Sequence, residues 1–153
     1  MPKITALIHT NNDALRLGRA LDSLRACDQV IVVDHGSTDN TEKVARDHGV
    51  DFKKGIAGVD RGTYAVDASH DWILCLQPNE SISERLEAAL FEWKDGDHKD
   101  ASGFNVRVRG DRPEGDVETR LINRTCMNWT GNLPPTFTVF DQLMGDILRF
   151  RSP

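Results

Sequence analysis

The sequence has no excess of basic residues and no long apolar run. Its 153 residues include 19 Lys and Arg against 24 Asp and Glu, which gives a formal net charge of −5 at pH 7. This balance argues against general nucleic-acid binding, because such binding needs positive charge to neutralise phosphates. No apolar stretch approaches the length of a membrane span, and no signal peptide precedes Ile4. We therefore expect a cytoplasmic protein, either free or peripheral at the inner membrane.

Cysteines are also few, and their spacing fits no metal site. The three are Cys27, Cys75 and Cys126, and Cys75 lies inside an apolar run. An odd, unpaired set of this kind indicates inert buried thiols in the reducing cytosol. With 39% hydrophobic and 28% charged residues, the composition is that of an ordinary globular protein, and the length fits one domain with a real core.

The most informative stretch is Val30 to Asn40, with the sequence VIVVDHGSTDN. The run of branched apolar residues predicts a strand buried on both faces, as in a parallel sheet. The turn residues that follow lead into a helical pattern from Thr41. Because α/β sheets bind ligands where strands end in such turns, we place Asp34 and His35 on the rim of a crevice.

The rest of the first ninety residues alternates in the same way. Strands are predicted at 4–8, 50–53 and 72–76, and helices at 14–25, 41–48, 59–69 and from Ser81 to about Trp93. Asp39 with Glu42, and Ser81 with Glu84, match the pattern of a helix-capping box. The pattern predicts an α/β domain with a mostly parallel sheet flanked by helices.

The last fifty residues are strand-rich. Strands are predicted at 104–108, 117–123 and 127–129, with mixed structure over 137–150. In the first of these, apolar residues alternate with Asn105 and two arginines, which is typical of a half-exposed strand. The arginines between Arg107 and Arg124 alternate with acidic residues, which favours a solvated sheet face.

Three polar turns follow the predicted strands of the first half: HTNND, DHGSTDN and QPNE. Parallel strands end at one edge, so these turns should converge there. His9 and His35 follow adjacent strands and should approach each other. A metal-binding histidine pair stays open, although no second pair has ligand spacing.

These turns, together with GVDRGTYAVDASHDWILCL and RLINRTCMNWTGNLPP, resemble the family-2 glycosyltransferases of the GT-A fold. The likeness is greatest to the short bacterial lipopolysaccharide-core glucosyltransferase-like branch. It implies a single GT-A-like domain over 1–153, with a nucleotide-binding half at 1–93 and an acceptor-side half at 101–153. It also implies a nucleotide-diphosphate sugar donor such as a UDP-sugar, Mg²⁺ or Mn²⁺, and inverting transfer. The implied acceptor is a carbohydrate or a lipid-linked saccharide of envelope polysaccharide or lipopolysaccharide synthesis.

The resemblance assigns residues to the nucleotide site. They are His9, Thr10, Asn11, Asn12, Asp34, His35 and Arg61. His35 stands where many relatives have a uracil-binding Asp.

The departures from the family pattern lie at the chemistry. Gln77 and Asn79 replace the two aspartates of the metal motif, and only Glu80 is retained. These three occupy the metal or diphosphate position. Neutral amides hold a divalent cation much more weakly than carboxylates do. Pro134, Pro135 and Thr136 stand where the similar branch has Val-His-Glu, so the catalytic base is not identified.

Arginine is the alternative counter-charge for a diphosphate, because a guanidinium matches phosphate in a bidentate way. Arg61 is the first choice, and the next are Arg107, Arg109, Arg120 and Arg124. Asp116, Glu118 and Asp141 stay open as the base.

Two readings other than an active transferase remain. One is a catalytically degenerate protein that keeps the nucleotide crevice or only its scaffold. The other is a partner subunit of an active transferase, docking through apolar surface near 129–140. A homodimer through the same surface also stays open.

Overall fold

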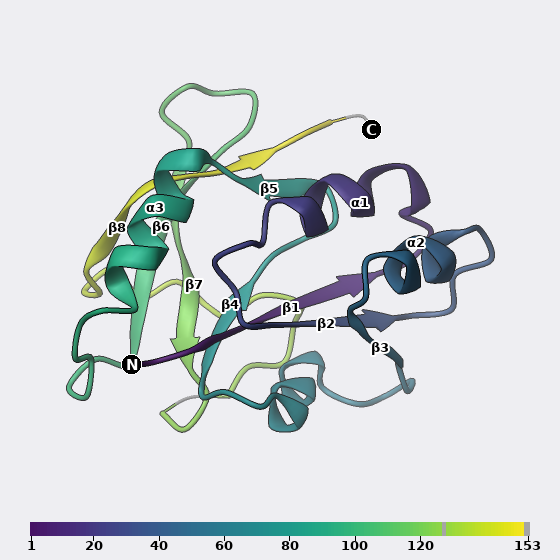
Figure 1. Cartoon of the computed structure of the whole chain (residues 1–153), viewed down its shortest axis with the longest axis horizontal. Helices are drawn as coiled ribbons and strands as arrows, with labels where there is room; N and C mark the ends of the chain where they lie inside the picture. Colours follow the sequence, from purple (N-terminus) through teal and green to yellow (C-terminus); the bar gives the residue numbers. More distant parts are fainter. Residues whose placement is uncertain (127, 152–153) are drawn as a thin grey trace.

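The computed structural model describes residues 1–126 and 128–151. Its elements, in chain order, are β1 (Ile4–Thr10), α1 (Ala14–Asp22), β2 (Gln29–Asp34), α2 (Thr41–Asp47), β3 (Asp51–Lys54), the 3₁₀ helix η1 (Arg61–Asp67), β4 (Trp72–Cys75), β5 (Glu80–Ile82), α3 (Glu84–Trp93), β6 (Gly103–Arg109), β7 (Asp116–Asn123) and β8 (Gln142–Arg149). The strands form one eight-stranded sheet in the order β3-β2-β1-β4-β7-β6-β8-β5 (Figure 1). The predicted α/β class is confirmed.

The first four strands are parallel, as the apolar runs predict. Thr10 lies opposite Asp34 in the β1–β2 pair, and Leu7 lies opposite Cys75 in the β1–β4 pair. The turns after β1, β2 and β4 therefore meet at one edge, as predicted, and the crevice that His9, Asp34 and Gln77 are expected to share stays a prediction. Beyond β4 the sheet is mixed: β7 runs against both β4 and β6, β8 runs parallel to β6, and β5 runs against β8.

Alternate residues of the central strands fill two separate cores. Ile4, Ala6 and Ile8 of β1 pack on the side of α1 and α3, whereas Leu7 faces the other side, with Tyr64 of η1. Figure 1 shows α1 and α2 side by side on one face and η1 on the other. Since side chains alternate along a strand, His9 shares the face of Leu7 and points toward Tyr64.

Two predicted helix caps are wrong. Ser81 belongs to the short strand β5, which pairs with β8, and the cap of α3 is Ser83, whose hydroxyl accepts from the Leu86 amide at 3.1 Å. At α2 the cap position is Asn40 rather than Asp39. Asp39 instead accepts from the amides of Thr41 and Ala14, and so joins the starts of α2 and α1.

Several predicted bounds also need correction. The first helix ends at Asp22, and the predicted helix at 59–69 is the shorter η1. His9 and Thr10 belong to β1 rather than to the turn that follows it. Asn128 and Trp129 are not in a strand, and Met127 lies outside the described residues.

Asn105 is buried, whereas the alternation predicted a half-exposed position. The register of the β6–β7 pair shifts between Phe104 and Asn105. The Asn105 amide nitrogen donates to the carbonyl of Phe137 at 2.8 Å, and its amide oxygen accepts from the Thr119 hydroxyl at 2.5 Å. A buried amide of this kind ties the segment before β8 to the sheet.

Among the described residues, no helix has both the length and the apolar character needed to cross a bilayer.

Candidate functional site

The turns after β1 and β2 are locked together by Asn12. Its side-chain oxygen accepts from the amides of Thr38 and Asp39, at 2.8 and 3.3 Å, and its backbone amide donates to the Ser37 hydroxyl at 2.8 Å. Asn12 has a φ of 55°, a left-handed conformation that Asn tolerates better than most residues. Asn12 is therefore a clamp that fixes one turn against the other.

Asn11 and Thr10 support the same arrangement. The Asn11 side-chain amide donates to the carbonyl of His35 at 2.5 Å. The Thr10 hydroxyl donates to Asp13 at 2.7 Å and is buried. Of the polar groups that the first turn contributes, most are thus used to shape it.

Asp34 is buried at the carboxyl end of β2 and organises the second turn. Its carboxylate accepts from the amide and the hydroxyl of Ser37. Its backbone carbonyl accepts from the Gly55 amide at 2.7 Å. The bonds within the turn leave Asp34 as a turn-fixing residue in this structure, and its contact with a nucleotide stays a prediction.

His9 and His35 meet at this edge, which confirms their predicted approach. Nδ1 of His9 lies 2.9 Å from Nε2 of His35, so one ring donates and the other accepts. Tyr64 packs edge-on against both rings, with centroids 5.7 and 6.2 Å away. Gly55 leaves room for His35, because a Cβ at that position would lie 2.4 Å from His35 Nδ1.

Both histidines are held in the neutral form. Burial, then the neighbouring His35, then the charge of Arg61 lower the pKa of His9 to about 4. Burial and Arg61 also lower the pKa of His35. The pair is therefore neutral at pH 7, since two imidazolium rings would bring two N–H groups and two charges together. Two rings bonded to each other do not form a metal site by themselves, and no third ligand completes one among the described residues.

Arg61 stands close to the two histidines at the start of η1. Its amide donates to the carbonyl of Thr130 at 3.0 Å, and its guanidinium donates to Asn132 at 2.5 Å. The next residue is a glycine, Gly62, and a side chain has no room there, because a Cβ would lie 2.1 Å from the carbonyl oxygen of Trp129. This glycine allows the 3₁₀ helix to approach the 129–132 segment, which in turn orients Arg61.

The turn after β4 has a different character. Gln77 and Asn79 are half-buried and carry neutral amides. Their neighbour Glu80 is fully buried, and both of its oxygens accept bonds: Arg120 donates at 2.7 and 2.8 Å, and Arg149 donates at 3.0 Å. Although burial alone raises it, the pKa of Glu80 is lowered by the Arg120 and Arg149 charges and by the Gln77 amide.

Arg120 corrects the prediction of a solvated arginine face. Its side chain is 0% exposed, and besides Glu80 it donates to the carbonyl of Cys75 at 3.1 Å and pairs with Glu118. An alternating charge pattern predicts exposed arginines. An arginine can nevertheless be buried where a carboxylate is available to pair with it. The burial of Glu80 and Arg120 could not be found from spacing, because they are forty positions apart.

The donor set at 77–80 does not fit a divalent metal. Two of the side chains are neutral amides, and the one carboxylate is neutralised by two guanidinium groups. Hard cations prefer charged oxygen ligands, and the nearby positive charges of Arg120 and Arg149 would repel them. No group of three His, Cys, Asp or Glu side chains in the described part of the chain is arranged to hold a metal.

The other predicted arginines and acids are used elsewhere. Arg124 donates to the carbonyls of Ala65 and Ala68 and pairs with Asp71, which ties η1 to the end of β7. Arg109 pairs with Asp146, and Arg107 donates to the Glu114 carbonyl. Asp116 pairs with Arg112, Glu118 pairs with Arg120 and Arg149, and Asp141 is exposed.

Sequence reasoning missed the residues that support the site. Tyr64, Gly55, Thr130 and Asn132 carry no motif of their own. One signal was available: Tyr64 is the single tyrosine of the chain and lies three residues after Arg61. That spacing brings two residues of a 3₁₀ helix onto the same face.

The model of the family described as Glycosyl transferase family 2 matches residues 5–144. The chain belongs to glycosyl transferase family 2. An uncharacterized glycosyltransferase of Rickettsia felis is 38% identical over 91 residues, which are 57% of this chain and 32% of that protein. One of Rickettsia prowazekii is 35% identical over 91 residues, which are 57% of this chain and 31% of that protein. The chain thus spans about a third of the length of these relatives.

Solved structures share the fold. S. aureus TarS, solved in complex with UDP-GlcNAc, gives a TM-score of 0.59 at 19% identity over 74% of this chain and 36% of that one. Glucosyl-3-phosphoglycerate synthase from Mycobacterium tuberculosis, solved with Mn²⁺, UDP and glucosyl-3-phosphoglycerate, gives a TM-score of 0.56 at 16% identity over 73% of this chain and 45% of that one. At these identities the likeness shows the GT-A type of fold, as the resemblance implied.

Proposed function

We propose that this chain binds a nucleotide-diphosphate sugar at the shared edge of β1, β2 and β4. The observation that carries the proposal is the convergence of the interlocked turns, the neutral histidine pair and Arg61 in a family-2 glycosyltransferase. UDP is the expected nucleotide, because TarS and the Mycobacterium synthase were both solved with UDP or a UDP-sugar. We place the nucleoside against His9–Asn12 and Asp34–His35, and the diphosphate toward Arg61.

We further propose that this binding needs no metal held by carboxylates. The Mycobacterium synthase was solved with Mn²⁺ beside UDP. In this chain, the turn that the resemblance assigns to the metal offers Gln77 and Asn79, and Glu80 already neutralises Arg120. A guanidinium supplies the counter-charge that a diphosphate needs, and Arg61 is the arginine beside the histidine pair.

The reaction that follows from the family is sugar transfer to an acceptor hydroxyl. The resemblance supports a carbohydrate or lipid-linked acceptor of envelope polysaccharide or lipopolysaccharide assembly. A degenerate nucleotide-binding protein is the second proposal. It is favoured by the occupied Glu80 carboxylate and by the pairing of the partly buried Glu118 with Arg120 and Arg149, which keeps that acid from acting as a base. Asp116 and Asp141 are exposed and stay open as the base.

Calorimetry with UDP and UDP-sugars tests the proposed site. We expect Arg61→Gln to weaken UDP binding by about tenfold, because one charged hydrogen bond to phosphate is lost. Arg46→Gln is the matched control, because Arg46 is an exposed arginine with one carboxylate partner on α2. Equal affinities in the two variants would remove Arg61 from the site, and an absence of UDP binding by the unmodified chain would overturn the proposal. Release of UDP from a UDP-sugar would separate the transferase from the degenerate protein.

A further inference from the structure

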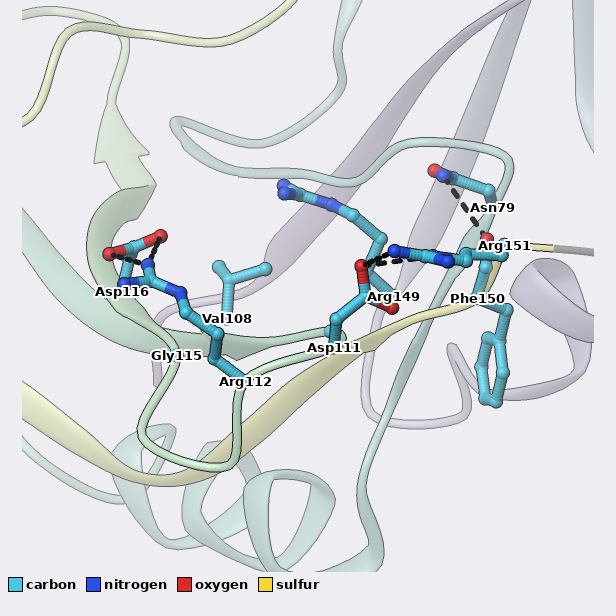
Figure 2. Close-up of a pocket in the computed structure, with 10 residues that line it drawn as sticks. Asn79, Val108, Asp111, Arg112, Gly115, Asp116, Arg149, Phe150 and Arg151 are labelled. Atoms are coloured by element: carbon cyan, nitrogen blue, oxygen red, sulfur yellow. Dashed lines mark hydrogen bonds and ion pairs between the residues drawn. The ribbon is translucent and has the colours of Figure 1, made fainter.

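A cavity opens at the same edge, beyond β4. Its volume is about 390 Å³, and it is lined by Asn79, by the hairpin between β6 and β7, and by the end of β8 (Figure 2). This volume lies within the range of small-molecule sites.

The sheet order places this cavity beside the turn at 77–79. β7 runs against β4, and β6 runs against β7, so the hairpin joining β6 to β7 returns to the edge where β4 ends. Asn79 exchanges hydrogen bonds with Phe150: its carbonyl accepts from the Phe150 amide at 2.8 Å, and its side-chain amide donates to the Phe150 carbonyl at 3.4 Å. In the sheet order β1 and β2 lie on one side of β4, and β7, β6 and β8 lie on the other, so the histidine pair and the cavity lie on opposite sides of β4 along this edge.

Three arginines and two aspartates line the cavity, and each of the arginines has a carboxylate partner. Arg112, Arg149 and Arg151 line it, against the two carboxylates of Asp111 and Asp116. Figure 2 shows Arg112 paired with Asp116 at one end, and Arg151 paired with Asp111 nearer to Asn79. Arg149 is held from below by buried Glu80, through its Nε and Nη2 atoms.

The two rim pairs are weak and replaceable. The side chains of Arg112 and Asp116 are 61% and 65% exposed, and those of Arg151 and Asp111 are 83% and 60% exposed. Exposed ion pairs contribute little to stability, so opening them costs little. A phosphate carries more charge than a carboxylate and accepts bidentate bonds from a guanidinium, so it competes well for both arginines.

We propose that this cavity is a subsite for a phosphate group carried by the acceptor. Anion binding in the cavity is inferred from the arginines alone. The assignment of that anion to the acceptor rests on the proposed function. A donor bound at the histidine pair would place its diphosphate toward Arg61 and the turn at 77–79, and the cavity lies on the far side of that turn. An acceptor held there by its phosphate would present a hydroxyl from the side opposite the nucleoside.

Calorimetry on the full chain with glycerol 3-phosphate, glycerol and UDP tests this subsite. The variant is the double change Arg112→Gln with Arg151→Gln, and both positions are exposed, so the fold should be retained. The matched control is Arg25→Gln with Arg46→Gln, two exposed arginines that each pair with one carboxylate elsewhere. Thermal unfolding of both variants checks that the fold is intact.

We expect glycerol 3-phosphate, but not glycerol, to bind, and the double variant to weaken that binding by about tenfold or more. The control variant and the UDP affinity of both variants should stay unchanged. A comparable loss of UDP affinity would assign the arginines to the donor diphosphate and overturn the acceptor subsite. Equal losses in the test and control variants, or no binding of glycerol 3-phosphate, would also overturn it. If glycerol 3-phosphate binds and UDP does not, the result counts against the proposed donor site and not against this subsite.

Discussion

Two stretches of the same sheet edge use their polar side chains differently. At the ends of β1 and β2, polar side chains fix the two turns, while the neutral histidine pair and Arg61 stand together beside them. At the end of β4, the retained carboxylate of Glu80 is buried between Arg120 and Arg149. The first stretch carries groups that suit a nucleotide, whereas in the second the carboxylate of Glu80 stabilises the fold through its ion pairs.

The comparison shows that a carboxylate close to a strand end can be structural. The charge of Glu80 stabilises two arginines and is not available to a cation. Glu80 and Arg120 are both buried, and each supplies the opposite charge that the other needs, because a buried ion must be paired.

The largest effect is expected at Glu80. Glu80→Gln leaves Arg120 buried without its charge partner, and we expect the free energy of unfolding to fall by about 3–5 kcal/mol in urea titrations. Glu118→Gln is the control, because Glu118 pairs with the same arginine from a partly exposed position and should cost less. The pair Glu80→Leu with Arg120→Met should recover most of the loss. A change below about 1 kcal/mol for Glu80→Gln would show that the buried pair is not structural.

The next effect concerns the pH dependence set by His9. Its pKa of about 4 in the folded chain lies below the ordinary value of 6.5, so the unfolded chain binds more protons between these values. Stability should therefore fall as the pH drops from 6.5 to 4, by about 2–3 kcal/mol from this residue. His9→Asn should remove that part of the slope in unfolding titrations at several pH values. Equal slopes for the two proteins would contradict the neutral pair.

A smaller effect is expected at the clamp between the turns. Asn12→Ala removes the acceptor for the Thr38 and Asp39 amides and places Ala at a φ of 55°, so we expect a loss of about 1–2 kcal/mol. Asn12→Gly keeps the left-handed conformation and separates the backbone part from the hydrogen bonds. Should Asn12→Ala melt at the same temperature as the unmodified chain, the turns do not depend on this clamp.

Much of the first half was predictable from the sequence. The apolar runs at β1, β2 and β4 are long and bounded by turn residues, so the parallel sheet and its polar edge followed from them. The meeting of His9 and His35 followed as well, because His9 lies near the end of β1 and His35 comes directly after the neighbouring strand β2. Ser81 misled for a local reason: it has a capping spacing, yet β5 pairs with β8, which lies more than sixty positions away.

The second half was less predictable because its structure depends on distant partners. Asn105 and Arg120 look exposed by alternation, but each finds a buried hydrogen-bonding partner on another strand. The cavity at the end of β8 depends on the return of the 110–115 hairpin to the edge where β4 ends. Neither these buried hydrogen bonds nor the position of the hairpin can be predicted from local residue spacing, since cross-sheet contacts are set by tertiary packing.

The most direct test of this account is the metal dependence of UDP binding. The unmodified chain is titrated with UDP in the presence of Mn²⁺ and again in excess chelator, with Gln77→Ala and Asn79→Ala alongside. We predict dissociation constants that agree within about twofold in both buffers and for both variants. Binding that appears only with Mn²⁺, and is lost when Gln77 or Asn79 is changed, would contradict the claim that this turn has given up the metal.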